Sequence, residues 1–172
     1  LVKNEIAVYS PHTAMDVVVG GVNDWLAHGV GPGTVTALQP IENSDAGQGR
    51  LVQLDDEVSF DELTERIKSF LGLKTVRTAS SAQHPMIKSV ALCAGAGSDV
   101  FQGVKADCFL TGEMSHHHIL ATIQNEASVI LCEHTHTERG YLPLFRKILT
   151  KGLGKEIDIL ISEIDSDPIK FN

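Results

Sequence analysis

Residues 128–140 read Ser-Val-Ile-Leu-Cys-Glu-His-Thr-His-Thr-Glu-Arg-Gly, an apolar run of strand length that opens into two histidines and two acids. A helical pattern begins directly afterwards, which indicates a strand-to-helix turn. His134 and Glu138 are four residues apart, so a helix that starts here places both on one face. Such a pair is either half of a divalent metal site or a polar helix cap, and this stretch alone does not decide between them.

The second half of the chain repeats this strand–turn–helix pattern. We expect strands at 74–79, 87–93, 107–110, 128–132 and 156–161. Helices are expected from the turn at 94–99 through about 104, from 113 through about 124, and from 137 to about 151. Alternating strands and short helices predict an α/β fold with a mixed, largely parallel sheet that helices cover on both faces.

The first half predicts strands at 5–9, 34–38 and 50–55 and a helix at 14–28. The clearest helix start is Ser59-Phe60-Asp61-Glu62, a capping box in which Ser is followed three residues later by Glu. Apolar residues then recur at helical spacing, and Gly72 fits a C-terminal glycine cap. This half therefore adds strands and helices to the same α/β fold.

The composition of the 172 residues excludes several classes of protein. Hydrophobic residues make up 42 % and charged residues 21 %, as in a globular protein with a substantial core. The net charge of −8 argues against a broad surface for nucleic acid or anionic membranes. The three cysteines each lie in an apolar run, which favours buried reduced thiols over disulfides or a catalytic thiolate.

The start of the chain carries no signal-peptide pattern, and no apolar run is long enough to span a membrane. The chain begins with Leu1 rather than methionine, directly before an expected strand. We therefore expect a processed or truncated chain from which part of the functional unit is missing.

Polar residues gather in the turns that follow the expected strands. In an open α/β sheet, the loops after the carboxyl ends of the strands share one edge, and ligands bind there. Four turns carry such residues: His12 with Asp16, Gly95 to Ser98, Gly112 to His118, and His134 with Glu138. This convergence favours a functional site over a set of unrelated helix caps.

Asp16, His134 and Glu138 supply two carboxylates and an imidazole for a metal site. Mixed nitrogen and oxygen ligands suit zinc, iron or manganese and do not select among them. Two metals would clamp a phosphoryl or carbonyl oxygen and activate a water for attack. Three ligands are too few for two metals, so other groups or waters are needed.

Three consecutive histidines, His116 to His118, form the most conspicuous cluster. Successive helical residues diverge by roughly 100°, so the three cannot all face one metal. Either one or two of them point at the site, as hydrogen-bond partners of ligands or as proton carriers, or they form a solvated helix start.

The turn Gly95-Ala96-Gly97-Ser98 resembles an anion-binding nest before a helix. It lacks the Gly-Lys-Ser/Thr ending of a P-loop and the third glycine of a dinucleotide fingerprint. A tight turn is the minimum interpretation, and phosphate binding by Gly95, Gly97 and Ser98 is a further prediction.

Four segments together resemble the NIF-three-like family, also called GTP cyclohydrolase 1 type 2 homologues, and in particular the C-terminal portion of a mammalian member. The segments occur in family order along nearly the whole chain. They are Tyr9-Ser10-Pro11-His12-Thr13-Ala14-Met15-Asp16, Val90-Ala91-Leu92-Cys93-Ala94-Gly95-Ala96-Gly97-Ser98, Asp107-Cys108-Phe109-Leu110-Thr111-Gly112-Glu113 and His134-Thr135-His136-Thr137-Glu138-Arg139-Gly140. No long inserted domain precedes Val90, as in the shorter members.

The resemblance implies a site with two divalent metal ions per subunit. Asp16, His134 and Glu138 match three of the family's ligands, and Glu138 also takes the catalytic role. A further histidine pair of the family has no counterpart here, so a metal is expected to be weakly held or absent in this chain. Residues expected to line the cavity or support the ligands are His12, Glu113, His117 and His136.

The resemblance also implies two related α/β domains in a ring-shaped homohexamer. Residues 1–172 would be the C-terminal domain with only an edge of the first domain and without the N-terminal half. A dimer or altered assembly is expected, because the absence of that half would expose apolar surface. Two functions follow as expectations. One is a metal-dependent hydrolase of a nucleotide or another phosphorylated small molecule. The other is a regulatory partner of transcriptional corepressors in cytoplasm and nucleus, without direct DNA or membrane binding.

Overall fold

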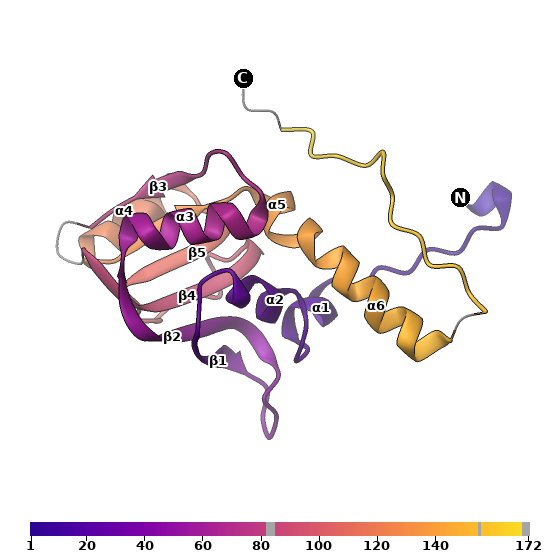
Figure 1. The fold of residues 1–172 in the computed structure, drawn as a ribbon, viewed down its shortest axis with the longest axis horizontal. Helices are drawn as coiled ribbons and strands as arrows, with labels where there is room; N and C mark the ends of the chain where they lie inside the picture. Colours follow the sequence, from indigo (N-terminus) through magenta and orange to yellow (C-terminus); the bar gives the residue numbers. More distant parts are fainter. Residues whose placement is uncertain (82–84, 155, 170–172) are drawn as a thin grey trace.

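One six-stranded sheet forms the centre of residues 1–81, 85–154 and 156–169, which the computed structural model describes (Figure 1). The order of the strands is β1-β2-β4-β5-β6-β3. Their bounds are β1 Gly33–Pro40, β2 Gly47–Ser59, β3 Arg77–Ala79, β4 Met86–Ala96, β5 Cys108–Glu113 and β6 Ser128–Leu131. The predicted strands at 34–38, 50–55, 87–93, 107–110 and 128–132 are thereby confirmed, and the strand at 74–79 is shorter than expected.

The sheet is mixed, as expected, but it is less parallel than predicted. The pairs β4–β5 and β5–β6 are parallel, whereas β1–β2, β2–β4 and β3–β6 are antiparallel. The parallel part coincides with the strand–turn–helix units of the second half. The antiparallel part arises because β1 and β2 form a hairpin, and this connection needs no crossover helix.

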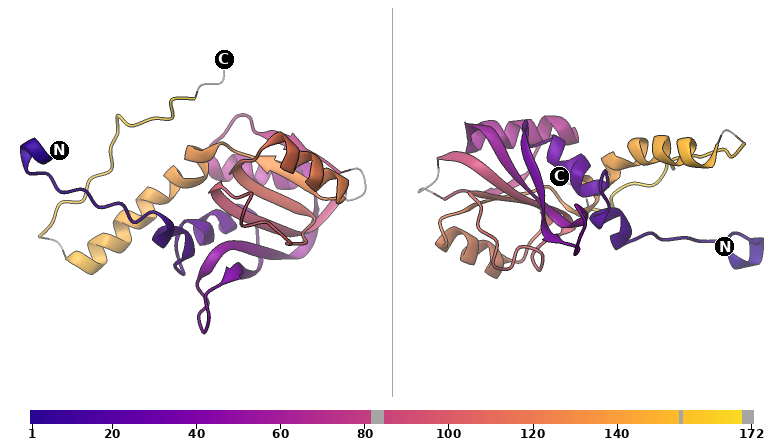
Figure 2. Two further views of the ribbon diagram at one scale, coloured as in Figure 1. Left: turned by 180° about the vertical axis from the view of Figure 1, so that it is seen from behind. Right: turned by 90° about the horizontal axis from the view of Figure 1, so that it is seen from below.

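Helices cover both faces of the sheet, as predicted (Figure 2). On one face lie α2 (Val22–His28) and α3 (Phe60–Leu71), and on the other lies α4 (His116–Gln124). The capping-box helix is confirmed, because the hydroxyl of Ser59 accepts a hydrogen bond from Glu62 N–H at 3.1 Å and Gly72 ends the helix in the left-handed conformation.

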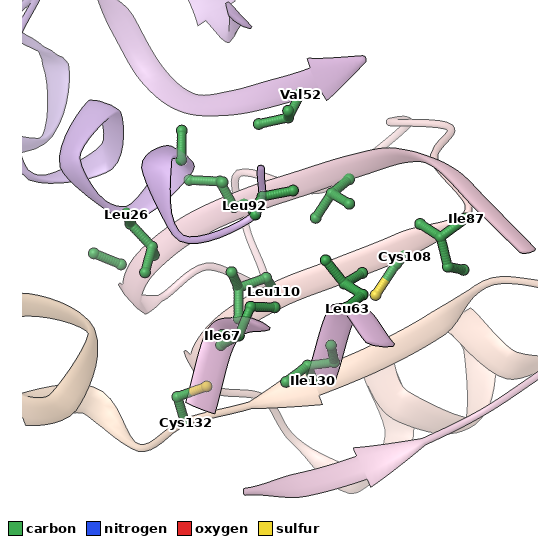
Figure 3. Close-up of a cluster of buried hydrophobic side chains, with 14 of the residues drawn as sticks. Leu26, Val52, Leu63, Ile67, Ile87, Leu92, Cys108, Leu110, Ile130 and Cys132 are labelled. Carbon is green, nitrogen blue, oxygen red and sulfur yellow. The ribbon is translucent and has the colours of Figure 1, made fainter. Parts of the chain in front are cut away.

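The larger core lies between the sheet and the α2 and α3 helices (Figure 3). Leu26, Leu63 and Ile67 come from the helices and meet Leu92 and Ile130 of the sheet. All five side chains are almost fully buried. A second cluster on the opposite face includes Phe101 and Phe109. Because β4, β5 and β6 are buried on both faces, their sequences are nearly continuous apolar runs.

The predicted helix at 14–28 is two helices, α1 (Thr13–Val17) and α2. Gly20 has a φ of 76°, a conformation that interrupts a helix. A Cβ on Gly21 would lie 2.2 Å from the carbonyl oxygen of Met15, so this close turn requires glycine. The adjacent glycines were therefore the signal for a break.

The helix expected after 134 is also divided. It consists of α5 (His134–Glu138), the 3₁₀ turn η2 (Arg139–Tyr141) and α6 (Leu142–Leu153). The helix expected through 104 is wrong, because residues 98–103 form turns. Gly103 has a φ of 75° in this segment, which does not suit a helix.

The strands expected at 5–9 and 156–161 are also wrong, because both segments lack a pairing neighbour in the described structure. The short η1 turn (Val2–Asn4) and the segment that leads from it to α1 extend away from the sheet, as does the segment after α6 (Figures 1 and 2). Val8 is 70 % exposed and Leu160 87 %. Their apolar pattern fits strands, but a strand needs a partner for its backbone groups.

Within the described residues, none of the helices combines the length and the apolar character that crossing a bilayer requires.

Candidate metal centre

The short α5 helix brings His134 and Glu138 together, as the four-residue spacing predicted. His134 Nε2 lies 3.1 Å from Glu138 Oε1, and His134 Nδ1 lies 2.6 Å from Glu113 Oε1 at the end of β5. The imidazole is therefore held between two carboxylates. Glu113 fixes the orientation of the ring, which is the role that a carboxylate beside a metal-binding histidine performs.

Asp16 faces the same cavity from α1. This cavity has a volume of about 580 Å³, and Asp16, His134 and Glu138 line it together with His12. The charges of Asp16 and His134 interact, as do those of Asp16 and Glu138. The structure thus gathers the three predicted ligands and His12 around one space.

Burial shapes the protonation of this cavity. Burial raises the pKa of Glu138, and His134 only partly opposes that shift. Burial likewise raises the pKa of Asp16. The hydrogen bond to Glu113 raises the pKa of His134. Two carboxylates that resist ionisation in a shared cavity are stabilised by a nearby cation, so the electrostatics suit a divalent ion.

Gly95 forms the floor below the His134–Glu138 pair. A Cβ at Gly95 would lie 2.8 Å from both Glu138 Oε1 and His134 Nε2, and the φ of Gly95 is 68°. The residue must therefore be glycine to leave this space open. Cys93 lies beside it, and burial raises the pKa of its thiol to about 12. The thiol stays protonated near neutral pH, as predicted for a buried cysteine.

Buried threonines hold the loops of this wall. The Gly95 N–H donates to Thr137 Oγ1 at 2.8 Å, and the same hydroxyl donates to the His134 carbonyl at 2.8 Å. The Gly97 N–H donates to Thr111 Oγ1 at 3.0 Å, and that hydroxyl donates to the Gly95 carbonyl at 3.0 Å. These bonds fix the backbone that positions the ligands.

The same bonds bear on the predicted phosphate nest. The N–H groups of Gly95 and Gly97 already have acceptors within the protein. Ser98 lines a different cavity, near α4. The turn is a tight connection, and the phosphate prediction gains no support from either amide.

The remaining predicted residues lie elsewhere. His117 is exposed on α4, and its ring lies 6.3 Å from that of His116. His136 Nδ1 lies 2.9 Å from the Cys132 carbonyl, a contact that ties α5 back to the end of β6. Neither residue lines the cavity. His118 Nδ1 lies 3.2 Å from Ser115 Oγ at the start of α4, so the histidine cluster forms an exposed helix start.

Two buried polar residues hold the α1 segment that carries Asp16, and the sequence did not point to either of them. The amide of Asn23 donates to the Asp16 carbonyl at 3.0 Å and accepts from the Ala94 N–H at 2.8 Å. Arg50 Nη2 donates to the Val18 carbonyl at 3.3 Å, and its guanidinium pairs with Asp24. Asn23 is followed by Asp24, and Arg50 is preceded by Gln48 and Gly49, so the sequence carries no local signal for either role.

Backbone strain occurs at the entrance to both helices of the site. Glu133, which precedes α5, has a φ of 65°, and His12, which precedes α1, has a φ of 40°. The Glu133 carboxylate accepts from Arg77 Nε at 2.9 Å, which anchors the strained turn to β3. Strained non-glycine residues concentrate at functional sites because the surrounding structure must enforce them.

No three His, Cys, Asp or Glu side chains in the described ranges stand close enough to form a complete metal-binding group. The residues nevertheless fit part of one: an imidazole fixed by a carboxylate, a second carboxylate against its other nitrogen, and a third across the cavity. The fold and this cavity define an α/β protein with a partial carboxylate–histidine site at the carboxyl ends of parallel strands.

Comparison with known proteins gives the family. Residues 1–168 match the model of Duf34/NIF3 (NGG1p interacting factor 3), and the chain belongs to this family. A NIF3-like protein 1 of Drosophila melanogaster is 40 % identical over 96 % of the chain and 58 % of that protein. The NGG1-interacting factor 3 of Saccharomyces cerevisiae is 39 % identical over 98 % of the chain and 63 % of that protein.

The chain therefore spans about 58 to 65 % of the length of the first relatives that it matches. The bovine NIF3-like protein 1 is 32 % identical, covering 97 % of the chain and 68 % of that protein, and its alignment runs over 258 residues. Because the present chain has 172 residues, that relative carries inserted residues, and the present chain resembles the shorter members.

Solved structures share the fold. HcgD of Methanocaldococcus jannaschii, in the reduced form, has a TM-score of 0.73 at 27 % identity, covering 87 % of this chain and 59 % of that chain. A Bacillus cereus protein related to NIF3 has a TM-score of 0.80 at 17 % identity, covering 99 % of this chain and 74 % of that chain. The second likeness shows the fold alone.

Proposed function

We propose that Asp16, His134 and Glu138 are ligands of a divalent metal site that supports hydrolysis of a nucleotide or another phosphorylated small molecule. The observation that carries this proposal is the His134 imidazole, held between Glu113 and Glu138 at the edge of a cavity that Asp16 also lines. In the complete site we expect two metal ions per subunit. Zinc, iron and manganese all accept this mixture of nitrogen and oxygen ligands.

A bound metal would supply a polarised substrate oxygen and a water of lowered pKa. The protein residues prepare the site for it. Glu113 holds His134 Nδ1, which leaves Nε2 directed into the cavity toward Glu138. Glu138 lies beside His134 Nε2 in the cavity, so it can also accept a proton from attacking water. Gly95 keeps the space in front of the pair free.

The test is binding of Zn²⁺, Fe²⁺ and Mn²⁺ by equilibrium dialysis, together with nucleoside triphosphate hydrolysis. Wild-type protein is compared with Glu138→Gln and with Glu163→Gln, an exposed carboxylate outside the cavity, as the matched control. Glu138→Gln should lose metal and turnover, and Glu163→Gln should retain both. Turnover that survives Glu138→Gln with metal bound contradicts the role assigned to Glu138. Because a further ligand pair of the family has no counterpart in this chain, weak binding is expected, and a wild-type chain that binds none of the three ions even at millimolar concentration contradicts the metal site.

A second candidate function is regulation through protein contacts. The yeast relative is named an NGG1-interacting factor, and exposed apolar side chains such as Tyr9, at 86 % exposure, provide surface for contacts. On this proposal the protein assembles as a homo-oligomer and meets transcription-regulatory proteins in cytoplasm and nucleus. The net charge of −8 favours protein contacts over direct DNA binding. Co-precipitation with such proteins that survives Glu138→Gln would separate this role from the hydrolase.

A further inference from the structure

The β1 strand forms an open edge of the sheet, and its residues do not line the candidate metal cavity. It runs over Gly33–Pro40 and pairs only with β2 among the described strands. In Figures 1 and 2, none of the described segments runs along its outer side. Edge strands offer unpaired N–H and C=O groups to any extended chain that approaches them.

The usual protections of an edge strand are missing from the centre of β1. No residue from Gly33 to Gln39 is charged or a proline, Gly33 to Thr36 are exposed, and Pro40 is confined to the C-terminal end of the strand. Val35 is 42 % exposed. Threonine and valine at the centre of the strand favour further pairing, because branched side chains pack well on a pleated surface.

The opposite edge of the sheet is protected. The β3 strand has three residues, and its Arg77 pairs with Glu133 at 2.9 Å. A short strand with a charged residue is a common defence against unwanted pairing. The two edges of one sheet therefore differ in the property that decides whether a further strand can add.

Carboxylates stand at both ends of β1. Glu42 and Asp45 lie in the hairpin loop after it, and a second group lies on β2 beyond Gly33, namely Asp55, Asp56 and Glu57. All five are exposed, and none forms an ion pair within the described residues. The ammonium of Lys88 donates to the Asp55 carbonyl at 2.8 Å and is the one cation seen bonded to this group in the described structure.

The carboxylates at both ends of β1 determine which kind of strand can pair with it. A second copy added antiparallel would place the acidic loop of one chain beside the β2 acids of the other, and a parallel copy would place equal ends together. Both arrangements bring carboxylates together, which is unfavourable. An extended segment with an uncharged centre and Lys or Arg at both ends meets no such repulsion and pairs with the acids.

We propose that β1 binds an extended segment of a partner protein as a seventh strand of the sheet, with an uncharged, β-branched centre and basic flanks. Main-chain hydrogen bonds supply affinity in this mode of recognition, and the flanking charges supply specificity. No β1 residue lines either of the cavities described above, so this surface works independently of the metal site.

The test uses a labelled peptide of sequence Arg-Lys-Thr-Val-Thr-Val-Thr-Lys-Arg and its counterpart with Glu in place of the four basic residues. Binding to the 172-residue chain is followed by fluorescence anisotropy, and β1 amide protection by hydrogen exchange. The basic peptide should bind and protect alternate β1 amides, and the acidic peptide should not bind. The triple variant Asp55→Asn, Asp56→Asn, Glu57→Gln should weaken binding by about tenfold, with its circular dichroism unchanged.

Equal binding of both peptides overturns the charge argument, as does equal binding by the triple variant. Protection outside β1 overturns the edge assignment. A further contrary result is a solution molar mass of the chain that doubles as its concentration rises, with β1 amides protected in the absence of peptide. That result identifies a second copy as the occupant and overturns the proposal.

Discussion

The two walls of the candidate metal cavity are built in different ways. The wall that carries His134 and Glu138 stands at the ends of buried parallel strands, and its loops are held by Thr111 and Thr137. The wall that carries Asp16 is α1, a five-residue helix without a buried residue. The strands and loops of the first wall fix the positions of His134 and Glu138 directly. The position of Asp16 on the second wall depends on side chains from other parts of the sequence that hold α1. The following predictions test that difference.

The largest expected effect is at Arg50, whose side chain is 2 % exposed. Arg50→Met removes the hydrogen bonds to the Gly47 and Gly49 carbonyls and the tie to Val18. Each buried carbonyl left without a partner costs about 1–3 kcal/mol and the partly exposed Asp24 adds less, so urea unfolding should show a loss of about 3–5 kcal/mol. Arg66→Met, which removes a partly exposed arginine, serves as the control and should lose about 1 kcal/mol or less.

The Arg50 effect should depend on pH through Asp24. Burial raises the pKa of Asp24, but the hydrogen bonds from Arg50 and Gly20 and the charge of Arg50 outweigh it, so the pKa lies below the ordinary 3.8. A lowered folded pKa stabilises the protein above 3.8, and this contribution is lost as the pH falls through the folded pKa. The stability difference between wild type and Arg50→Met should therefore shrink below about pH 4. A difference that stays constant into acid contradicts the ion-pair explanation.

The next effect is at Asn23, which links the two walls directly. Asn23→Leu leaves the Asp16 carbonyl and the Ala94 N–H without a partner in the interior. The buried Ala94 N–H costs about 1–3 kcal/mol and the part-buried Asp16 carbonyl about 1 kcal/mol, so the free energy of unfolding should fall by about 2–4 kcal/mol. Metal affinity should fall as well, because Asp16 loses its position. Unchanged metal affinity in the folded variant would mean that α1 is fixed by other contacts.

A smaller loss of stability is expected at Thr137, on the wall that carries His134 and Glu138. Thr137→Val keeps the shape but leaves the Gly95 N–H without its acceptor, at a cost of about 1–3 kcal/mol. Thr122→Val removes a hydroxyl that donates to the His118 carbonyl on an exposed helix and should have little effect. Equal losses in the two variants would show that the buried bond does not support the wall.

The smallest effect on stability is at Glu113. Its side chain is 51 % exposed, so Glu113→Gln should change the free energy of unfolding by less than about 1 kcal/mol. The measurable change is at His134, because its raised pKa depends first on the hydrogen bond to Glu113. NMR titration without metal should show a lower pKa for His134 in the variant. The raised pKa stabilises the fold at pH values below the unfolded pKa, and this contribution is lost as the pH rises through the folded pKa.

The same contrast explains what could be predicted from the sequence. The strands β4 to β6 and the His134–Glu138 pair follow from local patterns, because apolar runs and a four-residue spacing are written in consecutive residues. The α1 segment is held by Arg50, which bonds to Val18 32 residues away, and by Asn23, which bonds to Ala94 71 residues away. No local pattern encodes contacts of this separation. The segments at 5–9 and 156–161 have the apolar pattern of strands but form none, because neither pairs with a strand of the described sheet.

Asp16 on one wall and Glu138 on the other are proposed to bind the same divalent metal site, and a double-mutant cycle tests this directly. The affinity of the 172-residue chain for Zn²⁺ at neutral pH is measured for wild type, Asp16→Asn, Glu138→Gln and the double variant. Each single substitution should weaken binding by about tenfold or more, and the double variant should be little weaker than either single variant. Affinity that is unchanged by Asp16→Asn, or losses that add independently, would contradict a site shared by the two walls.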